Sequence, residues 1–192
     1  MDIRKDMEDL LKILVEQSFK YSDAEPFKLA SGKTSNYYIN CKSTTLDSRA
    51  MCLIGRVFYH KIKDLGVKAV GGVPLGADPI VAATAFVSAQ DGNPLQAFIV
   101  RKEQKQYGLM KTIEGNVDEG DKVVIIDDVI TTGGSTLEAI DKSRAFGLDV
   151  VKAIVLVDRQ EGGRENIEKK GVPLEAIYTR DDLIRCHRKK HP

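Results

Sequence analysis

The chain has no tryptophan and only three cysteines among its 192 residues. The cysteines are odd in number and widely spaced, at Cys41, Cys52 and Cys186. That spacing matches neither a framework of disulfides nor the close pairs of a structural zinc site. We therefore expect reduced thiols, which are typical of a cytoplasmic protein.

An excess of charge of either sign is also absent, because 29 basic residues stand against 28 acidic ones. With a net charge of +1, no overall field predicts binding to nucleic acid or to a membrane surface. No apolar run approaches the ~20 residues of a membrane-spanning helix. Residues 3–15 instead carry apolar side chains at helical spacing between charges, which predicts an amphipathic helix rather than a signal peptide.

Short apolar runs alternate with helix-like segments through most of the chain. The runs at 68–73, 95–100, 122–127, 150–157 and 175–179 predict strands, and 48–63, 77–89, 135–146, 164–170 and the basic carboxyl-terminal segment predict helices. Apolar strands separated by helices indicate an α/β fold with a central, mostly parallel sheet flanked by helices. We expect one domain over residues 1–192, with residues 1–45 as a small amino-terminal helix and cap.

Polar side chains follow three of the expected strands directly. These are Arg101-Lys102, Asp127-Asp128 and Asp158-Arg159. In parallel sheets ligands bind at the carboxyl ends of the strands, so these residues are candidates for one site.

The stretch VVIIDDVITTGGST, residues 123–136, combines two carboxylates with a turn rich in glycine and hydroxyl groups. A glycine-rich turn at a helix amino terminus presents backbone N–H groups to an anion, as in a phosphate cradle. Asp127 and Asp128 could accept hydrogen bonds from sugar hydroxyls or face a metal ion. The alternative is a strand end followed by an ordinary helix cap. Two adjacent carboxylates directly before the turn favour a phosphorylated sugar as the ligand.

The same stretch resembles the phosphoribosyl-diphosphate (PRPP) motif of the type I phosphoribosyltransferases. The resemblance implies that Asp127 and Asp128 engage the ribose hydroxyls. It also implies that the following turn holds the 5-phosphate. The PRPP-binding residues implied after the acidic pair are Val129, Ile130, Thr131, Thr132, Gly133, Gly134 and Ser135.

Residues 101–108 read RKEQKQYG, and residues 113–115 read IEG. Three cations in five residues suit a lid that closes over a charged diphosphate, although a solvated charge run is the plainer interpretation. The segment resembles the catalytic lid of the orotate phosphoribosyltransferases, with the pattern R-K-x-x-K-x-H-G and then I-E-G. The resemblance implies PRPP contacts from Arg101, Lys102, Lys105 and Tyr107, and a catalytic role for Arg101, Lys105 and Asp128. Tyr107 stands where that family usually has histidine.

Two further segments are similar to the same family. FKLASGKTSNYYIN, residues 27–40, resembles its hood over the base, with Tyr38 and Ile39 at the orotate-contacting positions, and predicts two short strands around a Ser-Gly-Lys turn. Arg159 and Thr131 match its other orotate contacts, and a guanidinium suits the orotate carboxylate.

The loop GVPLGADPI, residues 72–80, matches the family's diphosphate loop. Many relatives carry an aromatic residue and a lysine at the positions of Leu75 and Gly76. We therefore expect this loop to bind through backbone N–H groups.

The resemblance implies transfer of the phosphoribosyl group from PRPP to orotate in UMP synthesis. It also implies Mg²⁺ held mainly by PRPP, with no certain protein ligand, and a homodimer whose lids act in trans. One alternative is a phosphoribosyltransferase for a purine or another base. Another is a PRPP sensor that binds nucleic acid through the basic residues 185–191, although such a run is more often solvated. We expect neither nucleic-acid nor membrane binding.

Overall fold

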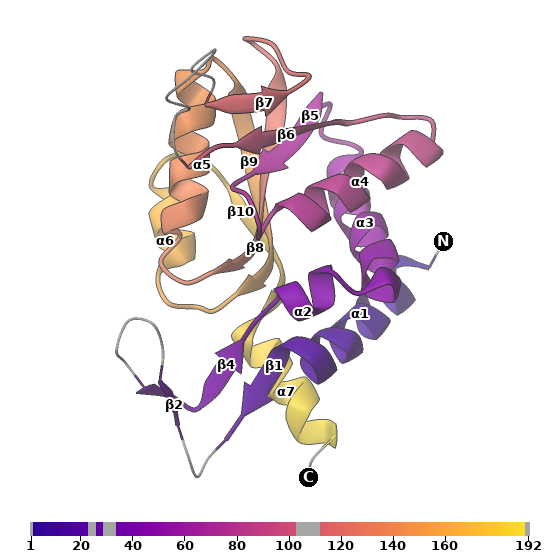
Figure 1. The fold of residues 1–192 in the computed structure, drawn as a ribbon, viewed down its shortest axis with the longest axis vertical. Coiled ribbons are helices and arrows are strands. Elements are labelled where there is room, and N and C mark those ends of the chain that lie inside the picture. Colours follow the sequence, from indigo (N-terminus) through magenta and orange to yellow (C-terminus); the bar gives the residue numbers. More distant parts are fainter. Residues whose placement is uncertain (1, 23–25, 29–33, 103–111, 191–192) are drawn as a thin grey trace.

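The centre of the molecule is a six-stranded sheet with the strand order β10-β9-β8-β5-β6-β7 (Figure 1). The computed structural model describes residues 2–22, 26–28, 34–102 and 112–190. The strands are β5 (Ala69–Gly72), β6 (Gln96–Val100), β7 (Ile113–Gly115), β8 (Lys122–Ile130), β9 (Asp149–Asp158) and β10 (Leu174–Thr179). All neighbours pair in parallel except β6 and β7, so the predicted α/β fold is confirmed.

Helices cover both faces of this sheet. They are α1 (Ile3–Ser18), α2 (Lys42–Thr45), α3 (Ser48–Ile62), α4 (Asp78–Gln90), α5 (Gly134–Ala145), α6 (Gly163–Glu168) and α7 (Arg180–Lys190). Alternate residues of β8 serve the two faces, as the period of a strand requires. Val124 and Ile126 pack in the core with α1, α3 and α4, whereas Val123 and Ile125 pack in the core with α5 and α6.

Short antiparallel strands form an extension below the sheet in Figure 1. β1 (Phe19–Tyr21) pairs with β4 (Tyr37–Ile39), and β2 (Phe27–Lys28) pairs with β3 (Thr34–Ser35). The two strands predicted in residues 27–40 are present, and the turn between them lies outside the described residues. We call residues 34–40 and their partner strands the hood.

The strands do not all end at the same level. β5 ends at Gly72, near the level of Ile126, whereas β8 and β9 stay paired up to Ile130 and Asp158. The last residues of β8 therefore have no strand on the β5 side. The chain also reverses its direction of travel across the sheet between β5 and β8, which is where α/β sheets bind ligands.

One local prediction needs correction, and two short strands were not predicted. β8 continues through Asp127 and Asp128 to Ile130, so the carboxylates lie within the strand rather than at its end. Residues 113–115 form an antiparallel edge strand, β7, which was not among the predicted strands. Phe19 begins β1 directly after the first helix, and its ring packs into the core beside Tyr37.

Candidate active site

Asp127 and Asp128, which we call the acid pair, occupy the unpaired flank of β8. Both are almost fully buried, at 7% and 4% exposure. One oxygen of Asp127 accepts a hydrogen bond from the Thr136 hydroxyl at 2.8 Å, and the other accepts from the backbone N–H of Asp128 at 3.0 Å. Asp128 Oδ1 accepts from the backbone N–H of Val129 at 2.9 Å. Its second oxygen, Oδ2, is buried without a hydrogen-bond partner among the described residues.

Burial governs the ionisation of the acid pair. Desolvation, helped by the neighbouring Asp128 carboxylate, raises the pKa of Asp127 to about 6. Desolvation also raises the pKa of Asp128, although the Lys42 ammonium opposes that effect. Two buried carboxylates with incomplete hydrogen bonding are costly for folding, which is the pattern expected of a binding site.

The turn after β8, residues 131–135, is the cradle predicted from the sequence. Gly133 is the amino-terminal cap of α5 and has a φ of 84°, which favours glycine. The first helical hydrogen bond that involves Gly133 runs from Leu137 N–H to its carbonyl. The N–H groups of the preceding first turn therefore have no helical partner, which is the arrangement that binds anions at helix amino termini.

A second loop, between β9 and α6, supports the cradle from outside. A Cβ on Gly163 would lie 2.7 Å from the Thr131 carbonyl oxygen, so the two backbones are in direct contact. Asn166 donates a hydrogen bond to the Thr132 carbonyl at 3.0 Å, and Arg159 N–H donates to the Ile130 carbonyl at 3.0 Å. The geometry of the cradle thus depends on residues 159–166, which the sequence did not identify for this purpose.

The loop between β5 and α4 closes the other side of the acid pair. A Cβ on Gly76 would meet Asp128 Oδ1 at 2.7 Å and Asp127 Oδ1 at 3.1 Å, so the backbone at position 76 lies against both carboxylates. Leu75 has a φ of 73°, and its N–H donates to Asp78 Oδ2 at 3.0 Å. The predicted loop is therefore adjacent to the acid pair, but the Leu75 N–H is already engaged within the loop.

Lys42, at the start of α2, is a neighbour of the acid pair that the sequence did not indicate. Its ammonium lies 3.8 Å from Asp128 Oδ2, and its side chain is half exposed. Because α2 has only four residues, no helical periodicity identified it beforehand. A Lys-Ser-Thr-Thr segment also carries no motif for an anion site.

Arg159 begins the loop after β9 and is held between a carboxylate and an aromatic ring. Its guanidinium pairs with Glu161 at 2.9 Å and lies 5.2 Å from the centre of the Tyr37 ring. The Tyr37 hydroxyl donates to the same Glu161 oxygen at 2.7 Å. Arg159 Nε is buried without a hydrogen-bond partner among the described residues. This arrangement leaves a guanidinium donor for a further anionic acceptor.

The two hood residues predicted to contact the base lie on opposite faces of β4. Ile39 faces the core, while Tyr38 is 42% exposed and contacts the Phe27 ring. Tyr37, which we had not assigned to the site, is the hood side chain that reaches Arg159. Base contacts through Tyr38 and Ile39 stay a prediction, as does the contact through Thr131, which is half-buried where β8 ends.

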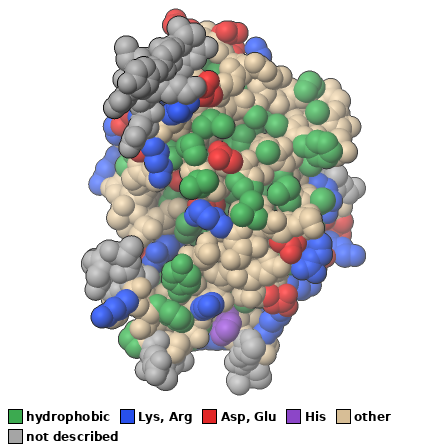
Figure 2. Space-filling model, in the orientation of Figure 1, with side chains coloured by type: hydrophobic (Ala, Val, Ile, Leu, Met, Phe, Trp, Pro, Cys, Tyr) green, Lys and Arg blue, Asp and Glu red, His purple; other side chains and the backbone are tan. Residues whose placement is uncertain are grey.

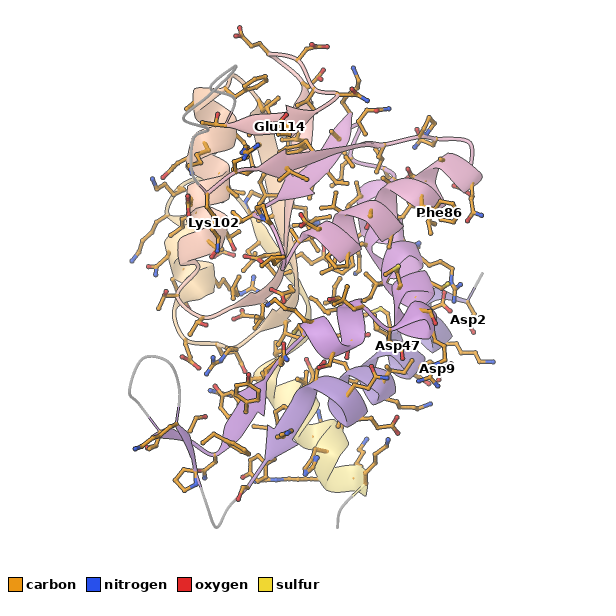
Figure 3. All side chains as sticks on the ribbon, in the orientation of Figure 1. Asp2, Asp9, Asp47, Phe86, Lys102 and Glu114 are labelled. Atoms are coloured by element: carbon orange, nitrogen blue, oxygen red, sulfur yellow. The ribbon has the colours of Figure 1, made fainter. Side chains whose placement is uncertain are left out.

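The root of the predicted lid lies on the paired strands β6 and β7. Arg101 pairs with Glu114 at 3.0 Å, and Lys142 of α5 donates to the carbonyls of Arg101 and Lys102, each at 2.7 Å. Figure 3 shows Lys102 beside α5 and Glu114 on the edge strand. No contact within the described part of the chain joins Arg101 or Lys102 to the acid pair. Lys105 and Tyr107 lie outside the described residues.

Metal binding by the protein alone has little support in the described ranges. They contain no cluster of three or more histidine, cysteine or acidic side chains that could hold an ion. The acid pair offers carboxylate oxygens beside the cradle, of which Asp128 Oδ2 accepts no hydrogen bond from the described residues. These residues fit Mg²⁺ that arrives with most of its ligands supplied by a phosphorylated substrate.

A buried acid pair, an anion cradle and a switch point in a parallel sheet are the features expected of a site for a sugar phosphate. The phosphoribosyl transferase domain model matches residues 69–177, more than half of the chain. The chain is 45% identical to the orotate phosphoribosyltransferase of Aquifex aeolicus (strain VF5) over 177 residues, covering 92% of this chain and 97% of that one.

Solved structures of orotate phosphoribosyltransferases are also similar to this chain. A structure of Mycobacterium tuberculosis H37Rv orotate phosphoribosyltransferase matches with a TM-score of 0.82 and 34% identity, covering 93% of this chain and 98% of that one. Another structure of the same enzyme, in complex with PRPP, matches with a TM-score of 0.77 and 32% identity over the same shares. The chain belongs to the phosphoribosyl transferase domain family and, within it, to the orotate phosphoribosyltransferases.

Among the described residues, no helix combines the length and the apolar character needed to cross a lipid bilayer.

Proposed function

We propose that this chain transfers the phosphoribosyl group of PRPP to orotate, giving orotidine 5-monophosphate and diphosphate in pyrimidine (UMP) biosynthesis. The observation that carries the proposal is the buried acid pair directly beside the cradle at the start of α5. Relatives that are named orotate phosphoribosyltransferases support it, and one solved relative holds PRPP.

The acid pair and the cradle fit the two ends of a ribose 5-phosphate. The carboxylates accept hydrogen bonds from the 2- and 3-hydroxyls, and the first turn of α5 binds the 5-phosphate through backbone N–H groups. Thr136 links the two, because its hydroxyl donates to Asp127 from within the first turn of α5. A sugar held at both ends presents C1 in a fixed direction, which reduces the entropic cost of the reaction.

In the proposed reaction, the bond between C1 and the diphosphate oxygen breaks, and a bond from C1 to the pyrimidine nitrogen forms. Positive charge develops at the ribose ring, where the carboxylate of Asp128 can stabilise it, while negative charge accumulates on the diphosphate. Mg²⁺ that is bound mainly by PRPP would neutralise part of that charge. Arg101, Lys102 and Lys105 are the proposed lid cations, and removal of one such contact typically costs ~2–4 kcal/mol.

Arg159 is the proposed site for the orotate carboxylate. A guanidinium presents a planar fork of donors that matches a carboxylate. Tyr37 supports the guanidinium from one side, and Glu161 pairs with it from another. An arginine whose position is fixed in this way can select a base that carries a carboxylate over adenine, hypoxanthine or uracil.

We also propose a homodimer in which each lid serves the partner's site. An apolar surface on α3 and α4 supports this proposal. The surface surrounds a hollow of about 1010 Å³ with Met51, Cys52, Phe86 and Val87 in its lining, and Phe86 is 65% exposed. Figure 2 shows hydrophobic side chains on this face of the molecule, and Figure 3 marks Phe86 on α4. Apolar surface of this kind often marks a protein interface.

One assay tests the reaction. Orotate absorbance is followed with PRPP and Mg²⁺, and adenine, hypoxanthine and uracil are tested in parallel. We expect rapid loss of orotate absorbance and no turnover of the other three bases. Turnover of a purine in place of orotate would contradict the substrate, whereas PRPP binding without turnover of any base would favour a sensor.

A further inference from the structure

In this chain position 76 is a glycine and supplies no cation to the acid pair. The backbone of Gly76 is so close to Asp128 that even a Cβ would lie 2.7 Å from its Oδ1 atom. Since real Cβ contacts are longer, a side chain at this position would displace the carboxylate. The loop after β5 therefore approaches the substrate as bare backbone, and any positive charge on this side must come from another element.

Lys42 provides that charge from α2. Its ammonium lies 3.8 Å from Asp128 Oδ2, the buried oxygen that has no hydrogen-bond partner among the described residues. Half of the Lys42 side chain is exposed, so the ammonium retains room for a second anion. The preceding residue, Cys41, is almost fully buried and fixes the start of α2 against the core.

The two carboxylates of the acid pair have different neighbours, and this difference indicates which end of the substrate lies near Lys42. Gly76 lies against both carboxylates, but Asp127 bonds to Thr136 on the cradle side, whereas Asp128 is the one that pairs with Lys42. In a ribose 5-phosphate the 2,3-diol lies between C5 and C1. With the diol on the acid pair and the 5-phosphate in the cradle, C1 and its diphosphate lie on the side of Lys42.

We propose that Lys42 binds the diphosphate of PRPP and remains paired with Asp128 while it does so. This inference rests on the proposed function, because it requires PRPP as the ligand. It assigns to the protein's own α2 a cation that does not depend on the lid of a partner subunit. Lys42 thereby connects the leaving group to the carboxylate that positions the ribose.

The test compares Lys42→Met and Lys42→Arg with Lys68→Met. Lys68 is a matched control, because its side chain is 51% exposed and its ammonium lies 3.7 Å from Asp121. Lys68 precedes β5, so it lies at the amino-terminal ends of the parallel strands, whereas the acid pair lies toward their carboxyl ends. Calorimetry measures the binding of PRPP, Mg²⁺-diphosphate and ribose 5-phosphate, and none of these measurements requires a base or turnover.

We expect Lys42→Met to weaken PRPP and Mg²⁺-diphosphate binding by about 10- to 100-fold, the usual effect of losing a charged contact. Binding of ribose 5-phosphate, which has no diphosphate, should change by less than about threefold, and this result also shows that the variant is folded. Lys42→Arg should recover most of the affinity, and Lys68→Met should match the wild type.

Two results would overturn the inference. One is unchanged binding of Mg²⁺-diphosphate by Lys42→Met. The other is an equal loss for ribose 5-phosphate and PRPP, which would limit Lys42 to a structural effect on Asp128. A wild-type chain that binds PRPP but leaves orotate unchanged would refute the proposed function alone and would leave the Lys42 comparison valid.

Discussion

Asp127 illustrates how a single residue can favour binding at the expense of stability. Its pKa is raised to about 6 by burial and by the Asp128 charge, whereas an unfolded aspartate titrates near ~3.9. The folded chain therefore holds this proton more tightly than the unfolded chain does. As the pH rises from about 4 to above 6, the folded state loses stability through this residue.

We predict that Asp127→Asn stabilises the protein at pH 8 by about 1–3 kcal/mol and has little effect near pH 4, where the wild-type carboxyl is protonated. The amide oxygen of the asparagine can still accept a hydrogen bond from the Asp128 N–H. It is a weaker acceptor than a carboxylate for the ribose hydroxyls, so PRPP binding should be reduced. Urea unfolding at both pH values measures the difference. A stabilisation that is equal at both would show that ionisation of Asp127 is not the cause.

Asp47 provides a control of opposite sign. Its carboxylate caps α3 by accepting from the N–H groups of Arg49 and Ala50, and a hydrogen bond from Gln17 is the largest cause that lowers its pKa. Because the folded state favours the ionised form, Asp47→Asn should destabilise the chain at neutral pH. This loss should begin to shrink as the pH falls below the range where unfolded aspartate ionises, and it should disappear only as the pH falls through the lower pKa of the folded Asp47 carboxyl.

Arg159 is expected to recognise orotate through its forked guanidinium. We predict that Arg159→Lys raises the KM for orotate by about 10- to 100-fold, because a lysine provides a single point of charge and cannot form two parallel hydrogen bonds. The affinity for PRPP should stay close to that of the wild type. Steady-state kinetics with each substrate varied in turn separates the two effects.

Arg180→Lys is a matched control, since the Arg180 guanidinium also lies over the Tyr37 ring, at 5.9 Å from its centre. It pairs with Asp181, and we assign it no contact with the base. The orotate KM of this variant should be unchanged. An equal rise in both variants would indicate that support of the Tyr37 ring matters rather than the Arg159 fork.

At the level of residues, the sequence revealed groups whose roles depend on neighbours in the chain. Asp127, Asp128 and the cradle form one continuous segment, so their chemistry could be predicted from their order. Lys42 reaches Asp128 across more than eighty positions of sequence, and Tyr37 reaches Arg159 from another sheet. Contacts of this kind arise only when α2 and the hood pack beside β8 and β9.

At the level of elements, the cradle depends on the contact between the α5 and α6 loops. We predict that Gly163→Ala weakens ribose 5-phosphate binding by about tenfold or more, because the new methyl group would lie 2.7 Å from the Thr131 carbonyl and displace the turn. The φ of Gly163 is not positive, so the effect is one of contact and not of backbone strain. Calorimetry with ribose 5-phosphate measures it.

Gly66→Ala distinguishes a local effect from general destabilisation. Gly66 has a φ of 64° and open space around it, so alanine there should cost about 1 kcal/mol of stability. It follows α3, away from the cradle, and should leave the binding of ribose 5-phosphate unchanged. Wild-type affinity in a folded Gly163→Ala variant would show that the two loops move independently.

Sequence periodicity identified the long elements and missed the short ones. The apolar run of β8 was evident, but its extension to Ile130 depends on continued pairing with β9, where Val129 opposes Val157 and Ile130 opposes Asp158. β7 has only three residues and is a strand because β6 offers it an unpaired edge. Neither partner can be identified from the local residues alone.

At the level of the whole molecule, the cations proposed for the site come from separate parts of the chain. Lys42 lies beside Asp128 and Arg159 lies beside the hood residue Tyr37, whereas Arg101 pairs with Glu114 at the far edge of the sheet. Lys142 of α5 donates hydrogen bonds to the carbonyls of Arg101 and Lys102, which holds the start of the lid against that helix. A lid that serves a partner's site would add its cations to Lys42 of α2 and to Arg159 of the loop after β9.

The proposed dimer predicts that two inactive variants restore each other. Lys105→Ala removes the proposed lid cation, and Asp128→Asn removes a carboxylate of the acid pair. If lids act in trans, a mixed dimer contains one site with both residues intact, so an equal mixture that exchanges subunits should regain about a quarter of wild-type activity. Adding Phe86→Glu to both variants places charge on the apolar surface of α4, which should yield monomers by size exclusion and abolish the recovery. Lids acting in cis would leave the mixture inactive, because each chain would then carry its own defect.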